Sequence, residues 1–500
     1  MAKEYIEICD TVRKFLSEPI GLYIDGKYVA AQSGKTFVTE NPSNRQPIAT
    51  VAEGAAEDID LAVQAARRAF DEGPWRNEFT AADRSKAIWR LGELLEEHAE
   101  ALSQLDALDN GKPVSVTANV DVKYSADHFR YFAGWPTKIE GSVIPVNAPN
   151  MLNYTVKEPV GVCGLIVPWN YPLLMAAWKI APAIAAGNAI VVKPAEQTPL
   201  SVLYLGKLFE EAGFPPGVFN VVSGFGGTAG AALVEHAGVN KVGFTGSLEV
   251  AQTIVRGSAD TLKRVSLELG GKSPNIVFKD ADIEKAALGC TWAAFGNNGQ
   301  SCTAGSRLYV ERPIFDEFVA EMSRQTSAIA VGPGMSKKQP DLGPVVSREQ
   351  FDRVSGYIRG AESDGAKVVC GGLAHGSSEL EDGYFILPTI VTDVSDDMTI
   401  VQEEVFGPVL CILPFDEEGE IIARANNTEF GLAAGLWTND LSRAHRVGKK
   451  LKAGTIWINN WGYTDPASPF GGMKKSGYGR EMGKEAIDLY SEVKSIWVQT

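Results

Sequence analysis

Ala-Ile-Val-Val-Lys-Pro at residues 189–194 is one of four short apolar runs, each followed by a longer helical pattern, that decide the fold. The others are Gly-Leu-Ile-Val-Pro (164–168), Val-Phe-Asn-Val-Val-Ser-Gly (218–224) and Lys-Val-Gly-Phe-Thr-Gly (241–246). Apolar runs of this length are typical of buried strands, and strands that alternate with helices favour a parallel sheet. We therefore expect an α/β fold with helices covering the sheet.

A second alternating series begins at Asn-Ile-Val-Phe (275–278) and continues with strand-like runs at 307–310, 367–370 and 409–414. It predicts a second α/β domain, for which a chain of 500 residues has room. Residues 55–97 carry the spacing of amphipathic helices, which we expect to be structural.

Two strand-like segments lie outside both series. Residues 141–162 alternate as a hairpin does, and residues 491–499 also favour a strand. Either segment would leave an unpaired edge by itself, so we expect the two to pair, within one chain or between subunits.

Composition excludes several classes of protein. The 47 Lys and Arg face 62 Asp and Glu, and the net charge of -15 disfavours binding to nucleic acid or to anionic membranes. Prolines and polar residues interrupt the most apolar stretch, 160–192, so no membrane span is expected. The six cysteines form no CxxC pair, and residues 1–7 lack the apolar core of a secretory signal. These features predict a cytoplasmic protein with reduced thiols and no metal site.

Two turns are candidates for binding a dinucleotide. Residues 221–230 resemble a phosphate-binding turn, but the glycines at 224, 226 and 230 do not form the usual GxGxxG, and a plain helix entry explains the turn equally well. In the second turn, Gly246 and Ser247 follow a strand and can cap a helix whose N–H groups face an anion, or act as an ordinary cap.

Lys193 and Glu196 lie at the carboxyl end of a predicted strand, the usual ligand edge of such sheets, although surface charges are an alternative. A carboxylate at Glu196 accepts hydrogen bonds from ribose hydroxyls and repels a 2′-phosphate. It therefore favours NAD over NADP.

Three residues are candidates for catalysis. Cys302 lies among small and polar residues before a strand, where a nucleophile and a buried structural thiol are equally compatible with the sequence. Glu268 is flanked by apolar residues that would raise its pKa, which suits a general base, whereas a helix-terminal Glu is the alternative. Asn170 lies in a turn fixed by Pro168 and Pro172, and its amide can donate to an oxyanion, although an ordinary turn asparagine is the alternative.

The order and spacing of these segments are specific over nearly the whole chain. They are Pro-Trp-Asn (168–170), Lys-Pro-Ala-Glu (193–196), Phe-Thr-Gly-Ser (244–247), Leu-Glu-Leu-Gly-Gly-Lys (267–272), Gly-Gln-Ser-Cys (299–302), Glu-Glu-Val-Phe-Gly-Pro (403–408) and Pro-Phe-Gly-Gly (469–472). Through them the chain resembles the aldehyde dehydrogenase superfamily, in its NAD-dependent hydrolytic type.

The resemblance implies three domains: a Rossmann-like NAD-binding domain from residues 1–140 and 160–270, a catalytic α/β domain from 271–477, and a small β oligomerisation arm from 141–159 and 486–500. A homodimer or homotetramer follows from the arm.

The resemblance also implies the chemistry. Cys302 attacks the aldehyde, Asn170 holds the oxyanion, and Glu268 activates the water that hydrolyses the thioester. Glu481 matches a proton-relay acid, for which a structural role is equally compatible. The implied NAD-binding residues are Ile166, Pro168, Trp169, Lys193, Glu196, Gly226, Gly230, Phe244, Gly246, Ser247, Leu269, Gln350, Glu404 and Phe406.

The implied substrate tunnel favours an apolar or aromatic aldehyde. Its residues are Tyr171, Leu174, Met175, Trp178, Phe295 and Phe470. Gly296, Trp461 and Asp465 leave betaine aldehyde or another amino-aldehyde as an alternative. Two further alternatives are a coenzyme A-acylating dehydrogenase and a catalytically silent, crystallin-like protein. Glu268 argues against the first, and the intact set of catalytic residues argues against the second.

Overall fold

The computed structural model describes residues 5–373 and 380–500, so the first four residues of the predicted non-secretory N-terminus lie outside it. Its first sheet has eight strands in the order β19-β11-β10-β7-β8-β9-β1-β2. The central five strands are parallel, which confirms the predicted α/β alternation. The strands are β1 (Leu22–Ile24), β2 (Lys27–Val29), β7 (Val162–Ile166), β8 (Ala189–Lys193), β9 (Phe219–Val221), β10 (Lys241–Thr245), β11 (Arg264–Glu268) and β19 (Gly477–Tyr478).

Helices cover both faces of this sheet because its strands are apolar on both sides. In β8, Ile190 and Val192 face one core, while Ala189 and Val191 face the other. The first core includes α4 (Ala81–Glu97), α5 (Ala99–Asp109), α7 (Lys123–Ala133), α8 (Pro172–Ala185) and α9 (Leu200–Glu211). The second includes α2 (Ala56–Asp71), α10 (Ala231–Glu235) and α11 (Leu248–Gly257). Strands buried on both faces are typical of parallel sheets.

A second sheet of seven strands, in the order β14-β15-β16-β13-β12-β17-β18, follows in the chain. Its strands are β12 (Pro274–Val277), β13 (Arg307–Glu311), β14 (Lys367–Leu373), β15 (Ile386–Thr392), β16 (Val409–Phe415), β17 (Ala433–Trp437) and β18 (Thr455–Ile458). Helices α12 (Ile283–Phe295) and α13 (Phe315–Ser327) cover one face. Helices α14 (Arg348–Ser363), α16 (Glu418–Asn426) and α17 (Leu441–Gly448) cover the other.

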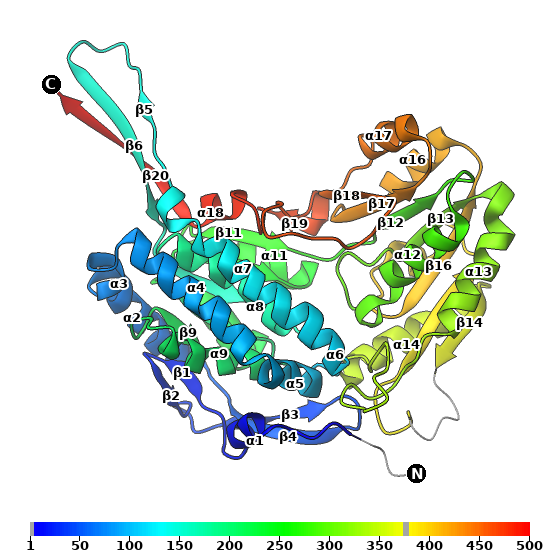
Figure 1. The fold of residues 1–500 in the computed structure, drawn as a ribbon, viewed down its shortest axis with the longest axis horizontal. Coiled ribbons are helices and arrows are strands. Elements are labelled where there is room, and N and C mark those ends of the chain that lie inside the picture. Colours follow the sequence, from blue (N-terminus) through cyan, green and yellow to red (C-terminus); the bar gives the residue numbers. More distant parts are fainter. Residues whose placement is uncertain (1–4, 374–379) are drawn as a thin grey trace.

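A three-stranded arm projects from the body of the molecule (Figure 1). It consists of β5 (Val143–Ile144), β6 (Met151–Pro159) and β20 (Ser491–Gln499) in the order β20-β6-β5. Strand β20 pairs with β6 in antiparallel register from Ser491↔Pro159 to Gln499↔Met151. The two predicted outlying segments therefore pair within one chain.

The sheet topology brings the predicted site residues to one edge. Strands β7, β8, β10 and β11 run parallel, and their last residues are in register, as in Ile166↔Lys193 and Thr245↔Glu268. The carboxyl edge of such a sheet is where ligands usually bind. Among the described residues, no helix is long and apolar enough to cross a membrane.

Candidate active site

The turn that carries Asn170 lies against the loop that carries Cys302. The Asn170 side-chain amide donates to the Gln300 carbonyl at 2.9 Å, and the Asn297 amide donates to the Asn170 carbonyl at 2.9 Å. The loop turns sharply because Asn297 (φ 52°) and Gly299 (φ 64°) have left-handed backbone conformations. An added Cβ at Gly299 would lie 2.1 Å from a backbone oxygen, so only glycine fits there.

Cys302 is partly exposed, and the charged groups that act most on its thiol are carboxyl groups. Burial, together with the charges of Glu404 and Glu268, raises the pKa of its thiol to about 12. The thiol is therefore protonated at neutral pH, and a base must remove its proton before it attacks. The Cys302 carbonyl also lies close to Gly271, where an added Cβ would be 2.5 Å away.

Glu268, the last residue of β11, is only 5% exposed. Neither of its carboxyl oxygens has a hydrogen-bond partner in the described part of the chain. Burial and the neighbouring charge of Glu481 raise its pKa well above the usual value. A buried carboxyl group with a raised pKa is a suitable general base, and it influences the Cys302 thiol electrostatically.

Glu481 lies beside Glu268 and is held by a residue that the sequence did not single out. Lys179 on α8 is fully buried and donates to one oxygen of Glu481, whose other oxygen has no partner among the described residues. The structure thus brings Glu268, Glu481 and Lys179 into one electrostatically connected group.

The predicted ribose-binding residues are held by hydrogen bonds within the protein. Lys193 is 3% exposed and donates to Glu196 at 3.0 Å. The Gly271 N–H donates to Glu404 at 2.9 Å, and an added Cβ at Gly270 would lie 2.0 Å from the same carboxylate. The two glycines therefore allow Glu404 to lie against the turn that follows Glu268.

Three further predicted cofactor residues meet at Phe406. The rings of Trp169 and Phe406 are in edge-to-face contact with centroids 5.2 Å apart. Gln350 donates to the Phe406 carbonyl at 2.6 Å, and Phe406 itself has a φ of 56°. The contact supports a backbone conformation that is rare for an aromatic residue.

The remaining cofactor candidates fit a dinucleotide. Ser247 caps α11, so the first N–H groups of this helix are available to an anion. Nothing lies within 4 Å of an added Cβ at Gly226 or Gly230, whereas one at Gly246 would strike the Phe244 ring at 2.4 Å. Open glycines beside a helix N-terminus suit a pyrophosphate. Ile166 ends β7, Pro168 follows it, and Leu269 follows β11.

Five of the six predicted tunnel residues belong to one core or pack against it. Four belong to the same core, against which Tyr171 and Cys302 also pack: Leu174, Met175, Trp178 and Phe470. The rings of Trp178 and Phe470 are 5.0 Å apart. Phe295 is fully buried in the core between α12 and the second sheet, and is not brought together with the others.

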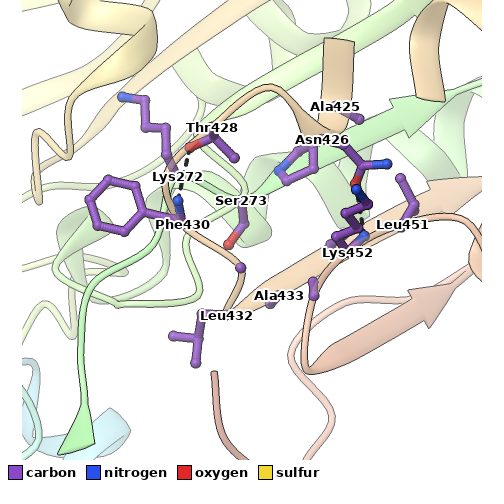
Figure 2. Close-up of a pocket in the computed structure, with 14 residues that line it drawn as sticks. Lys272, Ser273, Ala425, Asn426, Thr428, Phe430, Leu432, Ala433, Leu451 and Lys452 are labelled. Atoms are coloured by element: carbon purple, nitrogen blue, oxygen red, sulfur yellow. Dashed lines mark hydrogen bonds between the residues drawn. The ribbon is translucent and has the colours of Figure 1, made fainter. Parts of the chain in front are cut away.

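A small pocket lies beside the turn that follows Glu268, between Lys272, Ser273 and the segment 425–434 (Figure 2). The Lys272 ammonium donates to the Ile400 carbonyl at 2.7 Å, on α15 (Thr399–Gln402), which directly precedes the segment of Glu404. None of the predicted catalytic residues lines this pocket. Lys272 therefore has a structural role, which links the turn to the Glu404 segment.

Known proteins resemble this chain over nearly its whole length. The model of the aldehyde dehydrogenase family matches residues 28–496. An aldehyde dehydrogenase of Emericella nidulans is 49% identical over 96% of this chain and 95% of that protein. A solved NAD+ complex of an aldehyde dehydrogenase from Bacillus cereus is 51% identical, covers 99% of each chain and has a TM-score of 0.96. A betaine aldehyde dehydrogenase of Staphylococcus aureus, solved with NAD+, is 40% identical over 100% of this chain and 98% of that one, with a TM-score of 0.95.

The chain belongs to the aldehyde dehydrogenase family. The comparisons confirm the predicted fold class, the predicted NAD-dependent aldehyde dehydrogenase activity, and NAD as the cofactor.

Proposed function

We propose that this enzyme oxidises an aldehyde to a carboxylic acid through a thioester on Cys302, which water activated by Glu268 hydrolyses. The observation that carries the proposal is the meeting of three groups: the Cys302 loop, the Asn170 amide that is hydrogen-bonded to it, and the unpartnered, buried carboxyl group of Glu268. Buried groups with perturbed pKa values in this arrangement are typical of catalytic sites.

In the proposed reaction, a base takes the Cys302 proton and the sulfur attacks the aldehyde carbon to give a thiohemiacetal. An amide nitrogen carries two N–H groups, so Asn170 keeps one bond to Gln300 and offers the other to the oxyanion. After the hydride leaves, Glu268 removes a proton from water, and the water oxygen displaces sulfur to release the acid.

The residues at the carboxyl edge of the first sheet would hold NAD, which supplies the hydride acceptor when bound. Lys193 and Glu196 would bind the adenosine ribose, Glu404 and Phe406 the nicotinamide side, and the Ser247-capped helix the pyrophosphate. Glu481, held by Lys179, would serve as the acid that relays protons for Glu268; the electrostatic influence of both residues on the Glu268 carboxyl group supports this role.

We propose an apolar or aromatic aldehyde as the substrate, because the tunnel candidates near Cys302 are aliphatic and aromatic. An amino-aldehyde remains the second candidate, supported by the open space at Gly296 and the charge of Asp465 near buried His128. Acylation of coenzyme A and a silent, crystallin-like role are less well supported, since Glu268 and the other catalytic candidates are all present.

The arm supports a homodimer or homotetramer. Its apolar side chains Val143, Val493 and Trp497 are 73%, 66% and 56% exposed, which a second copy would cover. Sedimentation would then show an assembly that Trp497→Lys dissociates, whereas a monomeric unmodified protein would contradict the proposal. A cytoplasmic location stays a prediction and is supported by the six cysteines, all of which are free.

The experiment that tests the activity incubates the enzyme with NAD and a panel of apolar, aromatic and amino-aldehydes, without coenzyme A, and follows NADH. We expect NADH and free acid in equal amounts, with the fastest turnover on an apolar or aromatic aldehyde. If NADH formed only after coenzyme A was added, hydrolysis would be wrong.

A further inference from the structure

A buried lysine outside the proposed catalytic set lies directly against the substrate side of the site. Lys112 is 3% exposed, and its ammonium is 3.7 Å from the centroid of the Tyr171 ring. The same ammonium donates to Asp121 at 2.6 Å, and the Asp121 side chain is fully buried. A desolvated cation over an aromatic face is attracted by the electron-rich ring.

Tyr171 is the residue that connects this cation with the reaction centre. It directly follows Asn170, and the polar neighbours of its hydroxyl group, Ser301 and Asn297, belong to the Cys302 loop. Asn297 in turn donates to the Asn170 carbonyl. A displacement of the Tyr171 ring would therefore disturb both the oxyanion turn and the nucleophile loop.

The backbone around Lys112 is fixed, so the cation has a defined position. Asn110 donates to the Trp169 carbonyl at 2.7 Å, in the same turn as Asn170. Gly111 has a φ of 89°, and an added Cβ would lie 2.7 Å from Pro42 and Pro344. Only glycine allows the chain to turn there and direct Lys112 into the interior.

We propose that Lys112, held by Asp121, is a positioning residue that fixes the Tyr171 ring and, through it, the Asn170 turn against the Cys302 loop. An ion pair in a protein core costs desolvation free energy that a pair of apolar residues would not. A role in orienting the groups that stabilise the oxyanion would account for keeping the Lys112–Asp121 pair despite this desolvation free energy. Small displacements of such groups slow a reaction strongly. This inference rests on the proposed roles of Cys302 and Asn170.

The test compares Lys112→Met/Asp121→Asn, which removes both charges and leaves neither one unpaired, with the unmodified enzyme. Single-turnover NADH formation, with enzyme in excess over aldehyde, reports the steps up to hydride transfer. We expect the rate constant, normalised to the amount of reactive Cys302 thiol found by titration, to fall at least about tenfold. The Kd for NAD should not change. Arg424→Met, which breaks an ion pair between α16 and Asp396 in the segment that follows β15, controls for general destabilisation and should leave the rate constant unchanged.

A double-mutant cycle separates positioning from a loss of stability. Tyr171→Leu removes the ring, so the charge-pair substitutions should have little further effect on the rate constant in that background. In the otherwise unmodified enzyme, Lys112→Arg keeps the cation and should retain most of the rate. If the two effects multiply, or the rate per thiol is unchanged, Lys112 does not act through Tyr171. Should the double variant not fold, Tyr171→Leu alone still decides, because a normal rate in it overturns the inference. Failure of the proposed function would instead appear in the unmodified enzyme, as NADH formation that blocking Cys302 does not stop.

Discussion

The charged groups on the cofactor side of this site have hydrogen-bond partners within the protein, whereas the carboxyl group of Glu268 on the reacting side has none among the described residues. At the cofactor side, Lys193 is paired with Glu196, and Glu404 accepts a hydrogen bond from Gly271. At the reacting side, Glu268 is buried with neither oxygen partnered by any residue that the structure describes, and the pKa of the Cys302 thiol is raised to about 12. The cofactor-binding groups are thus paired in advance, whereas the Glu268 carboxyl group keeps its hydrogen-bonding capacity for the reaction.

The largest effect is expected for Cys302→Ala, which removes the only nucleophile in the proposed mechanism. NADH formation should fall by at least about a thousandfold, while NAD binding measured by calorimetry is retained. Cys370→Ala is the matched control, since Cys370 is also partly exposed but lies on β14. Full activity of Cys302→Ala would assign the nucleophile elsewhere.

Asn170→Ala should have the next largest effect. Loss of one oxyanion donor typically costs about 10²–10³ in kcat, and here the bond to Gln300 is lost as well. Asn170→Asp keeps the shape but replaces the donor by an acceptor, so it should be at least as slow. Steady-state kinetics at saturating NAD measure both variants, and a change confined to the aldehyde KM would refute the oxyanion role.

On the cofactor side, Glu196→Gln should weaken NAD binding and reduce the preference for NAD over NADP, each by roughly ten- to a hundredfold. These factors are those expected for hydrogen bonds to a charged group. The ratio of kcat/KM for the two cofactors measures the effect, with Glu211→Gln on α9 as a surface control. An unchanged ratio would show that Glu196 does not face the ribose.

The last effect, about tenfold for each pH unit, is expected from pH. Because the pKa of the Cys302 thiol is raised, its thiolate fraction grows about tenfold per pH unit throughout the range below that pKa. Alkylation by iodoacetamide, corrected with Cys302→Ala, should therefore accelerate steadily from pH 7 to 9 in the cofactor-free enzyme. A plateau that began below pH 8 would mean a lowered pKa of the thiol and would weaken the contrast between the two sides.

The sequence predicted the strands and the residues at their ends better than the way distant side chains meet. Apolar alternation located β8 and β10, and the residues after each strand reached one edge because parallel strands end together. Lys112 carried no signal, because its partner Asp121 and the Tyr171 ring come from other segments. Phe295 was grouped with the tunnel, although the last turn of α12 directs it into the core between α12 and the second sheet, a choice that local sequence does not reveal.

The account depends most on Glu268 as the group that separates thioester formation from its hydrolysis. Glu268→Gln, mixed with NAD and a good aldehyde substrate, should release about one NADH per active site and then stop. Intact-mass spectrometry should show the acyl group added to the chain, and Cys302→Ala/Glu268→Gln should lack it. Continued turnover of Glu268→Gln at the normal rate, with no acyl adduct, would contradict the hydrolytic role of Glu268.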